Sequence, residues 1–153
     1  MLDDTTDHGL VLLRFAPALV FLMHGGGRLL GVGPYAGSVG GFAGFLGGQG
    51  VPAAIAFAWL VTLLEVLGGL ALMAGALTRL FAIGLAVNML VATLLVHLPN
   101  GYAVGDGGYE LSLTLLLLML AVALTGPGDH SVDLRVFEEE PTPRALWERV
   151  AGG

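Results

Sequence analysis

The stretch PAAIAFAWLVTLLEVLGGLALMAG, residues 52–75, decides the fold class. Its 24 residues include a single charged side chain, that of Glu65. A helix needs about 20 mostly apolar residues to cross the hydrocarbon core of a bilayer. Three further segments, at roughly 10–30, 78–98 and 108–126, meet the same requirement. The sequence therefore predicts an all-α integral membrane protein, built as a four-helix bundle of transmembrane spans.

The composition agrees with this prediction. Of the 153 residues, 56% are hydrophobic and only 12% are charged, about half of the charged share that is usual in soluble domains. A soluble domain of this size has too small a core to bury so much apolar surface. Within residues 14–128 the charged side chains are Arg14, Arg28, Glu65, Arg79, Asp106 and Glu110.

We expect residues 1–134 to form the four-span domain, and residues 135–153 to form an acidic cytoplasmic tail with a short amphipathic helix that begins at Thr142. Arg79 and the arginines of the tail flank one side of the membrane, whereas Arg28 alone flanks the other. Cytoplasmic flanks carry an excess of arginine, so both termini are expected in the cytoplasm. Residues 1–9 are acidic and lack the basic region of a cleaved signal peptide, which predicts a retained first span.

Several classes of function are disfavoured. The net charge is −6, lysine is absent, and the six arginines are scattered, which argues against nucleic-acid binding. Because cysteine is absent, the chain offers no disulfide, no thiol relay and no thiolate ligand. His24, His97 and Glu110 match a two-histidine, one-carboxylate iron site by ligand type, but no local spacing supports it, so no metal is expected.

Ionisable groups at membrane depth are costly unless they are paired or hydrated, so each needs a reason. Aligning the spans by depth places His24, Arg28, His97 and Glu110 in an outer layer near one interface. These four are candidates for binding a polar headgroup or handling protons. The alternative is structural: an Arg28–Glu110 ion pair, with the two histidines capping helix ends.

An inner layer contains Arg14 and Glu65. Glu65 lies too deep to reach either interface, so it must contact Arg14 or Asn88 or hold a proton, and we interpret Arg14 and Glu65 either as an ion pair or as part of a proton path. Gly69 and Asn88 are assigned to helix packing, because small residues and neighbouring polar ones are typical of helix contacts in membranes. Asn88 and His97 are nine positions apart, which places them on opposite faces of a regular helix unless that span bends.

The connection at residues 31–51 is rich in glycine and free of charge. Two structures are open for it. Phe42, Phe45 and Leu46 would form one apolar face of a short interfacial helix, or the segment would be a flexible loop at the membrane surface. A phosphate-binding loop is not expected, because no Lys-Ser or Lys-Thr pair follows the glycines.

Several short motifs, in order, resemble the DoxX family across residues 10–134. They are LLRF at 12–15, FLMHG at 21–25, TLLEVLGGLAL at 62–72, GALTR at 75–79, GGYEL at 107–111 and GPGDHSVD at 126–133. The resemblance implies a four-helix protein of the prokaryotic cytoplasmic membrane with both termini inside. It also implies that Arg14, His24, Gly25, Glu65, Gly69, His97 and Glu110 are the family's motif positions. Arg28 stands where the family is expected to prefer lysine, so lysine-specific chemistry is not available here.

The DoxX resemblance implies a part in a respiratory or oxidative-defence redox system, such as the membrane subunit of a thiosulfate:quinone oxidoreductase. Since the chain has no cysteine, we expect no intrinsic cofactor, and redox chemistry would depend on a bound quinone and on protein partners. A non-catalytic scaffold or chaperone is the alternative, and a small-solute or lipid transporter is a further one. Membrane lipid is an expected partner, and self-association is left open.

Overall fold

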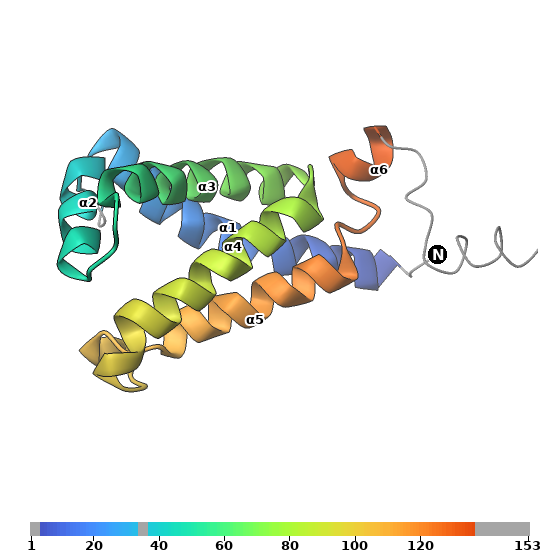
Figure 1. The fold of residues 1–153 in the computed structure, drawn as a ribbon. Coiled ribbons are helices and arrows are strands. Elements are labelled where there is room, and N and C mark those ends of the chain that lie inside the picture. Colours follow the sequence, from blue (N-terminus) through green and yellow to red (C-terminus); the bar gives the residue numbers. More distant parts are fainter. Residues whose placement is uncertain (1–3, 34–36, 137–153) are drawn as a thin grey trace, which may run out of the picture.

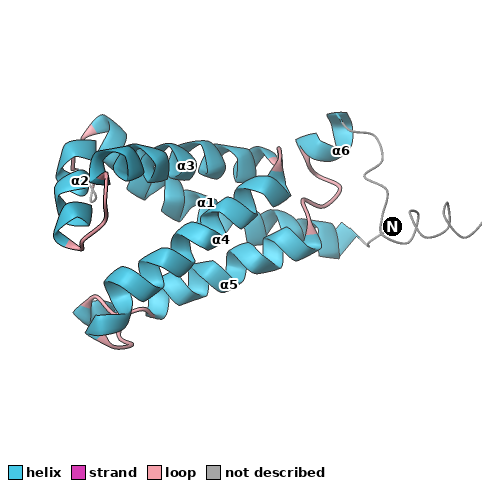
Figure 2. Cartoon of the chain, viewed as in Figure 1, coloured by secondary structure: helices cyan, strands magenta, loops and turns pink. Residues whose placement is uncertain are grey.

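The computed structural model describes residues 4–33 and 37–136, and within them it contains helices, turns and loops but no strand (Figure 2). The α-helices are α1 (Asp4–Leu30), α2 (Val39–Gly48), α3 (Ala54–Ala74), α4 (Thr78–Ala92), α5 (Glu110–Thr125) and α6 (Val132–Val136). A π-helical turn, Thr93–His97, continues α4, and two 3-10 turns follow at Leu98–Asn100 and Val104–Asp106. The expected tail helix after Thr142 lies outside the described residues.

The helices α1, α3, α4 and α5 run alternately up and down and form one bundle (Figure 1). Helix α1 packs against α3 and α5, and α4 packs against the same two helices. Helix α2 lies at the end of the bundle where α1 finishes and α3 begins, while α6 lies at the other end, near the start of α1 (Figure 1). Of the two structures that the sequence left open for residues 31–51, the short helix is the one present, since α2 covers Phe42–Leu46.

Three helices are long and apolar enough to cross a membrane: Thr5–Leu30, Ala54–Ala74 and Thr78–Asn100. Helix α5 is apolar but shorter, with 16 residues and a length of about 24 Å. Large apolar side chains point outward from several helices, among them Leu12, Leu80 and Leu124. An outer surface of this kind suits contact with lipid chains.

Glycines allow α1 and α3 to pack closely in two places. A Cβ atom on Gly25 would lie 2.8 Å from the Cβ of Glu65, and one on Gly69 would lie 2.6 Å from the Cγ of Leu22. Neither distance is sterically allowed, so each helix presents a glycine to a side chain of the other. This is the role that the sequence predicts for Gly69, and it is typical of helix contacts in membranes.

At the opposite end from α2, the segment after α5 is held by side chains from distant parts of the chain. The buried guanidinium of Arg14 donates to the carbonyl oxygens of Pro127 and His130. The carboxylate of Asp133 accepts the backbone N–H groups of Leu77, at 2.6 Å, and Thr78, at 2.9 Å. Leu77 precedes α4 in a left-handed conformation, with φ 47°, and its side chain provides no cap. Asp133 therefore supplies the N-terminal cap of α4.

Candidate functional site: a cavity between the helices

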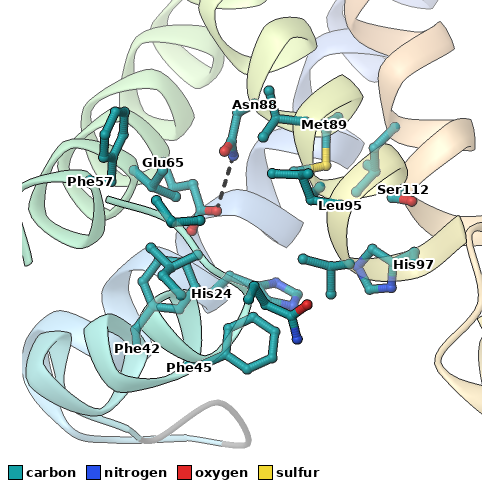
Figure 3. Close-up of a pocket in the computed structure, with 18 of the residues that line it drawn as sticks. His24, Phe42, Phe45, Phe57, Glu65, Asn88, Met89, Leu95, His97 and Ser112 are labelled. Atoms are coloured by element: carbon teal, nitrogen blue, oxygen red, sulfur yellow. Dashed lines mark hydrogen bonds between the residues drawn. The ribbon is translucent and has the colours of Figure 1, made fainter. Parts of the chain in front are cut away.

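A cavity of about 570 Å³ lies between α1, α2, α3, α4 with its π-helical turn, and the start of α5 with the loop before it. This volume is within the range of ordinary small-molecule pockets. Most of the lining side chains are apolar, and a few polar ones from different elements face the same space (Figure 3). The polar or ionisable ones are His24, Arg28, Gln49, Glu65, Asn88, His97 and Ser112.

The ion pair in the cavity wall joins Arg28 of α1 to Glu65 of α3, and both side chains are largely buried. The guanidinium of Arg28 donates a hydrogen bond to Oε2 of Glu65. Neither expected partner is correct: Glu65 is not paired with Arg14, which holds backbone carbonyls instead, and Arg28 is not paired with Glu110. Arg28 reaches Glu65 because side chains on a helix lean toward its N-terminus, which directs the guanidinium of Arg28 back toward the middle of the bundle.

Two further contacts fix this ion pair. The side-chain amide of Asn88 on α4 donates to Oε1 of Glu65 at 3.4 Å, as the dashed line in Figure 3 shows. The guanidinium of Arg28 lies 4.1 Å from the ring centroid of Phe42 on α2, in a cation–π arrangement. Asn88, which the sequence assigned to helix packing and also gave as a possible partner of Glu65, lines the cavity and contacts its charged pair.

The π-helical turn brings His97 into the same cavity as Asn88. On a regular α-helix, nine residues at about 100° each would place the two side chains on opposite faces. The wider turn at Thr93–His97 changes that relation, and both side chains line the cavity. Single π-turns occur frequently at functional sites. The sequence allowed both residues to face one site only if this span departs from a regular helix, and the π-turn is such a departure.

Both histidines in the cavity wall make a hydrogen bond through Nδ1. His24 Nδ1 lies 2.9 Å from the carbonyl oxygen of Val20, one turn back on α1. His97 Nδ1 lies 2.8 Å from the carbonyl oxygen of Gly107 in the loop before α5. Since a carbonyl oxygen only accepts, each Nδ1 carries a proton and donates it. These bonds set the orientation of both rings.

Glu110 does not line the cavity, although the sequence grouped it with His24, Arg28 and His97. Its Oε2 accepts the backbone N–H of Val104 at 3.1 Å, so its side chain shapes the loop between the π-turn and α5. Nor do the two histidines and Glu110 come together as a metal site: no group of three possible ligands does so within residues 4–33 and 37–136.

The sequence profile of the DoxX family matches residues 9–98, which is more than half of the chain. The chain belongs to the DoxX family. This part of the DoxX protein includes Arg28, Glu65, Asn88 and His97, so the profile covers the polar groups of α1, α3 and α4 in the cavity wall. The expectation drawn from the motifs at 12–15, 21–25, 62–72 and 75–79 is confirmed.

Curated relatives agree with this assignment. The DoxX chain is 33% identical over 127 residues to "Inner membrane protein YqjF" of Escherichia coli, covering 83% of this chain and 91% of that one. It is 28% identical over 137 residues to "Putative oxidoreductase CatD" of Bacillus subtilis, covering 90% of this chain and 93% of that one. It is also 32% identical over 97 residues to an uncharacterized membrane protein of Mycobacterium tuberculosis, covering 57% and 60% of the two chains. No solved structure gives a significant match.

Phe42 is a cavity residue whose contact with Arg28 the sequence did not predict. Its position in an uncharged, glycine-rich connection gave no sign that its ring would cover Arg28. The available signal was its spacing, because Phe42, Phe45 and Leu46 lie on one face of a helix. All three line the cavity, so the apolar face of α2 is its wall at that end.

Proposed function

We propose that this DoxX protein is the membrane subunit of a respiratory or oxidative-defence redox system and binds a quinone headgroup in its cavity. The observation that supports this is a largely apolar cavity inside a bundle of apolar helices, with hydrogen-bonding groups from α1, α3, α4 and the π-turn on its walls. A quinone is an apolar ring with two polar oxygens, and it reaches such a site through the lipid.

The charge of the cavity favours a neutral ligand. The cation of Arg28 is offset by the carboxylate of Glu65, and the guanidinium is already engaged by that carboxylate and by the Phe42 ring. A phosphate headgroup would have to compete with Glu65 for the same cation and would bring a second negative charge close to the carboxylate. A quinone ring avoids this repulsion.

The aromatic wall favours a flat ring. Phe42, Phe45 and Phe57 come from α2 and α3 and line the cavity together. Offset or edge-to-face contacts between aromatic rings add about 0.5–1.5 kcal/mol beyond the burial of apolar area. A planar quinone ring can make such contacts, whereas an acyl chain cannot.

Membrane topology and partners belong to the same proposal. We infer that α5 is the fourth span, because it packs along α4 and its outward side chains are apolar. The start of α1 and the described residues after α5, up to residue 136, lie at one end of the bundle (Figure 1), which fits two cytoplasmic termini with the arginine bias. The chain has no cysteine, so electrons would come from a partner protein. A relative that is named a putative oxidoreductase supports this assignment.

The test is mass spectrometry of small molecules extracted from the gently purified protein. We expect the wild type to retain a quinone, in its oxidised or reduced form, and the His97→Ala variant to retain much less of it. His8→Ala is the matched control, since His8 lies at the other end of the bundle, beside His130, and does not line the cavity. If all three proteins carry only bulk phospholipid, the quinone proposal is wrong and a scaffold role becomes the better explanation.

A further inference from the structure

The hydrogen bond between His97 and Gly107 determines what its imidazole can offer a ligand. Because Nδ1 donates its proton to the carbonyl oxygen of Gly107 at 2.8 Å, the neutral ring has no proton on Nε2. Nε2 is then an acceptor. The same carbonyl oxygen also accepts a hydrogen bond from the side-chain amide of Asn100 at 3.3 Å. This second bond holds the Gly107 carbonyl in place, and the carbonyl in turn selects the tautomer of His97.

A second acceptor faces the cavity from α3. The carboxylate of Glu65 has no proton to donate while it is ionised, and its two oxygens offer about four lone-pair positions. Arg28 uses one of these, and Asn88 contacts the other oxygen at 3.4 Å, longer than a usual N–H···O bond. Figure 3 shows Glu65 and His97 on different walls of the cavity.

The two redox forms of a quinone differ in what they can donate. An oxidised quinone presents two carbonyl oxygens, which only accept, whereas the reduced quinol presents two hydroxyl groups, which donate and also accept. Arg28 can donate to either form, so it does not discriminate between them. The Nε2 atom of His97 does discriminate, because an acceptor that faces a carbonyl oxygen is left without a hydrogen bond.

We infer that the cavity holds the quinol more tightly than the quinone, with one hydroxyl donating to His97 Nε2 and the other to Glu65. This inference rests on the quinone site proposed above and adds its redox preference. A site that binds the reduced form more tightly raises the midpoint potential of the bound couple. A tenfold preference corresponds to about 30 mV for a two-electron couple, which favours electron transfer onto the bound quinone.

The experiment measures the affinity of the purified protein in lipid nanodiscs for three compounds, without oxygen and at mildly alkaline pH. The compounds are decylubiquinone, decylubiquinol and the dimethyl ether of decylubiquinol, which keeps the ring and substituents but cannot donate. We expect the wild type to bind the quinol more than tenfold more tightly than the quinone, because the bond to His97 alone allows about tenfold and the bond to Glu65 adds to it. The ether should bind no better than the quinone.

Two variants assign the preference to His97. His97→Phe keeps a ring but removes one of the two acceptors, so the preference for quinol over quinone should fall about tenfold from the wild-type value and leave only the part that Glu65 supplies. His8→Phe makes the same chemical change away from the cavity and should keep the wild-type ratio. If the wild type binds the quinone as tightly as the quinol, or the ether as tightly as the quinol, this inference is wrong while the quinone site stands. If none of the three compounds binds, the proposed function itself fails.

Discussion

Asn88 and His97 line the same cavity although nine positions separate them, because the π-helical turn at Thr93–His97 breaks the regular α-helical register. A π-turn is equivalent to one extra residue in an α-helix. Deleting Leu94, which is half exposed on the outer surface, should therefore restore the α-helical register and turn His97 away from the cavity. We expect decylubiquinol to bind about tenfold more weakly to this variant, by isothermal titration calorimetry.

The control for this deletion is Leu94→Ala, which shortens the side chain but leaves the number of residues unchanged. It should bind decylubiquinol like the wild type. Unchanged binding in the deletion variant, with the protein still folded, would show that the register of this turn does not position the site.

The Arg28–Glu65 ion pair predicts that substitutions at these two positions have strongly non-additive effects on the free energy of unfolding. Removing one member leaves the other charge buried in an apolar bundle, at a cost of about 3–5 kcal/mol. We therefore expect Arg28→Leu or Glu65→Leu alone to lower the unfolding temperature sharply in detergent. The double variant should be more stable than either single one, because no isolated charge remains. Additive losses in the double variant would contradict the pair.

Asp133 predicts a stabilising contact at the far end of the bundle. Its carboxylate accepts the backbone N–H groups of Leu77 and Thr78, so Asp133→Ala leaves the start of α4 uncapped. Loss of an N-cap costs about 0.5–2 kcal/mol, and unfolding should occur at a correspondingly lower temperature. Asp129→Ala removes the same charge four residues earlier without touching α4 and should change stability little. Equal losses of stability in the two variants would mean that the negative charge, and not the cap, stabilises this end of the bundle.

The positions of the helices could be predicted from the sequence, because hydropathy alone marks where a chain can enter the bilayer. The segments expected at 52–75 and 78–98 correspond closely to α3 and to α4 with its two following turns. Close packing at Gly69 could be predicted too, since a residue without a side chain in an apolar helix has few other uses.

The side-chain partners could not be predicted in the same way. Aligning the spans by depth placed Glu65 with Arg14 and Arg28 with Glu110, and it treated each charge as lying at the height of its own Cα. An arginine head lies several ångströms from its Cα, toward the start of the helix, and that reach changes which charges meet. Capping by Asp133 and the ring of Phe42 over Arg28 depend on tertiary contacts that no local pattern encodes.

Two neighbouring glycines on α1 allow a sharper test of how close packing supports the site. A Cβ on Gly25 would lie 2.8 Å from Glu65 Cβ and 3.0 Å from the carbonyl oxygen of Thr62, whereas a Cβ on Gly26 meets nothing within 4 Å. Gly25→Ala must therefore push α1 away from α3. We expect a loss of about 1–3 kcal/mol in stability from overpacking, and weaker binding of decylubiquinol because Arg28 and Glu65 are then farther apart.

Gly26→Ala is the matched control, because it adds the same methyl group one position along the same helix. Alanine favours helix over glycine by about 1 kcal/mol, so this variant should be as stable as the wild type or more stable. Thermal unfolding and decylubiquinol titration of both variants give the comparison. Equal stability and equal affinity in the two variants would mean that the close approach at Gly25 does not hold Glu65 in place.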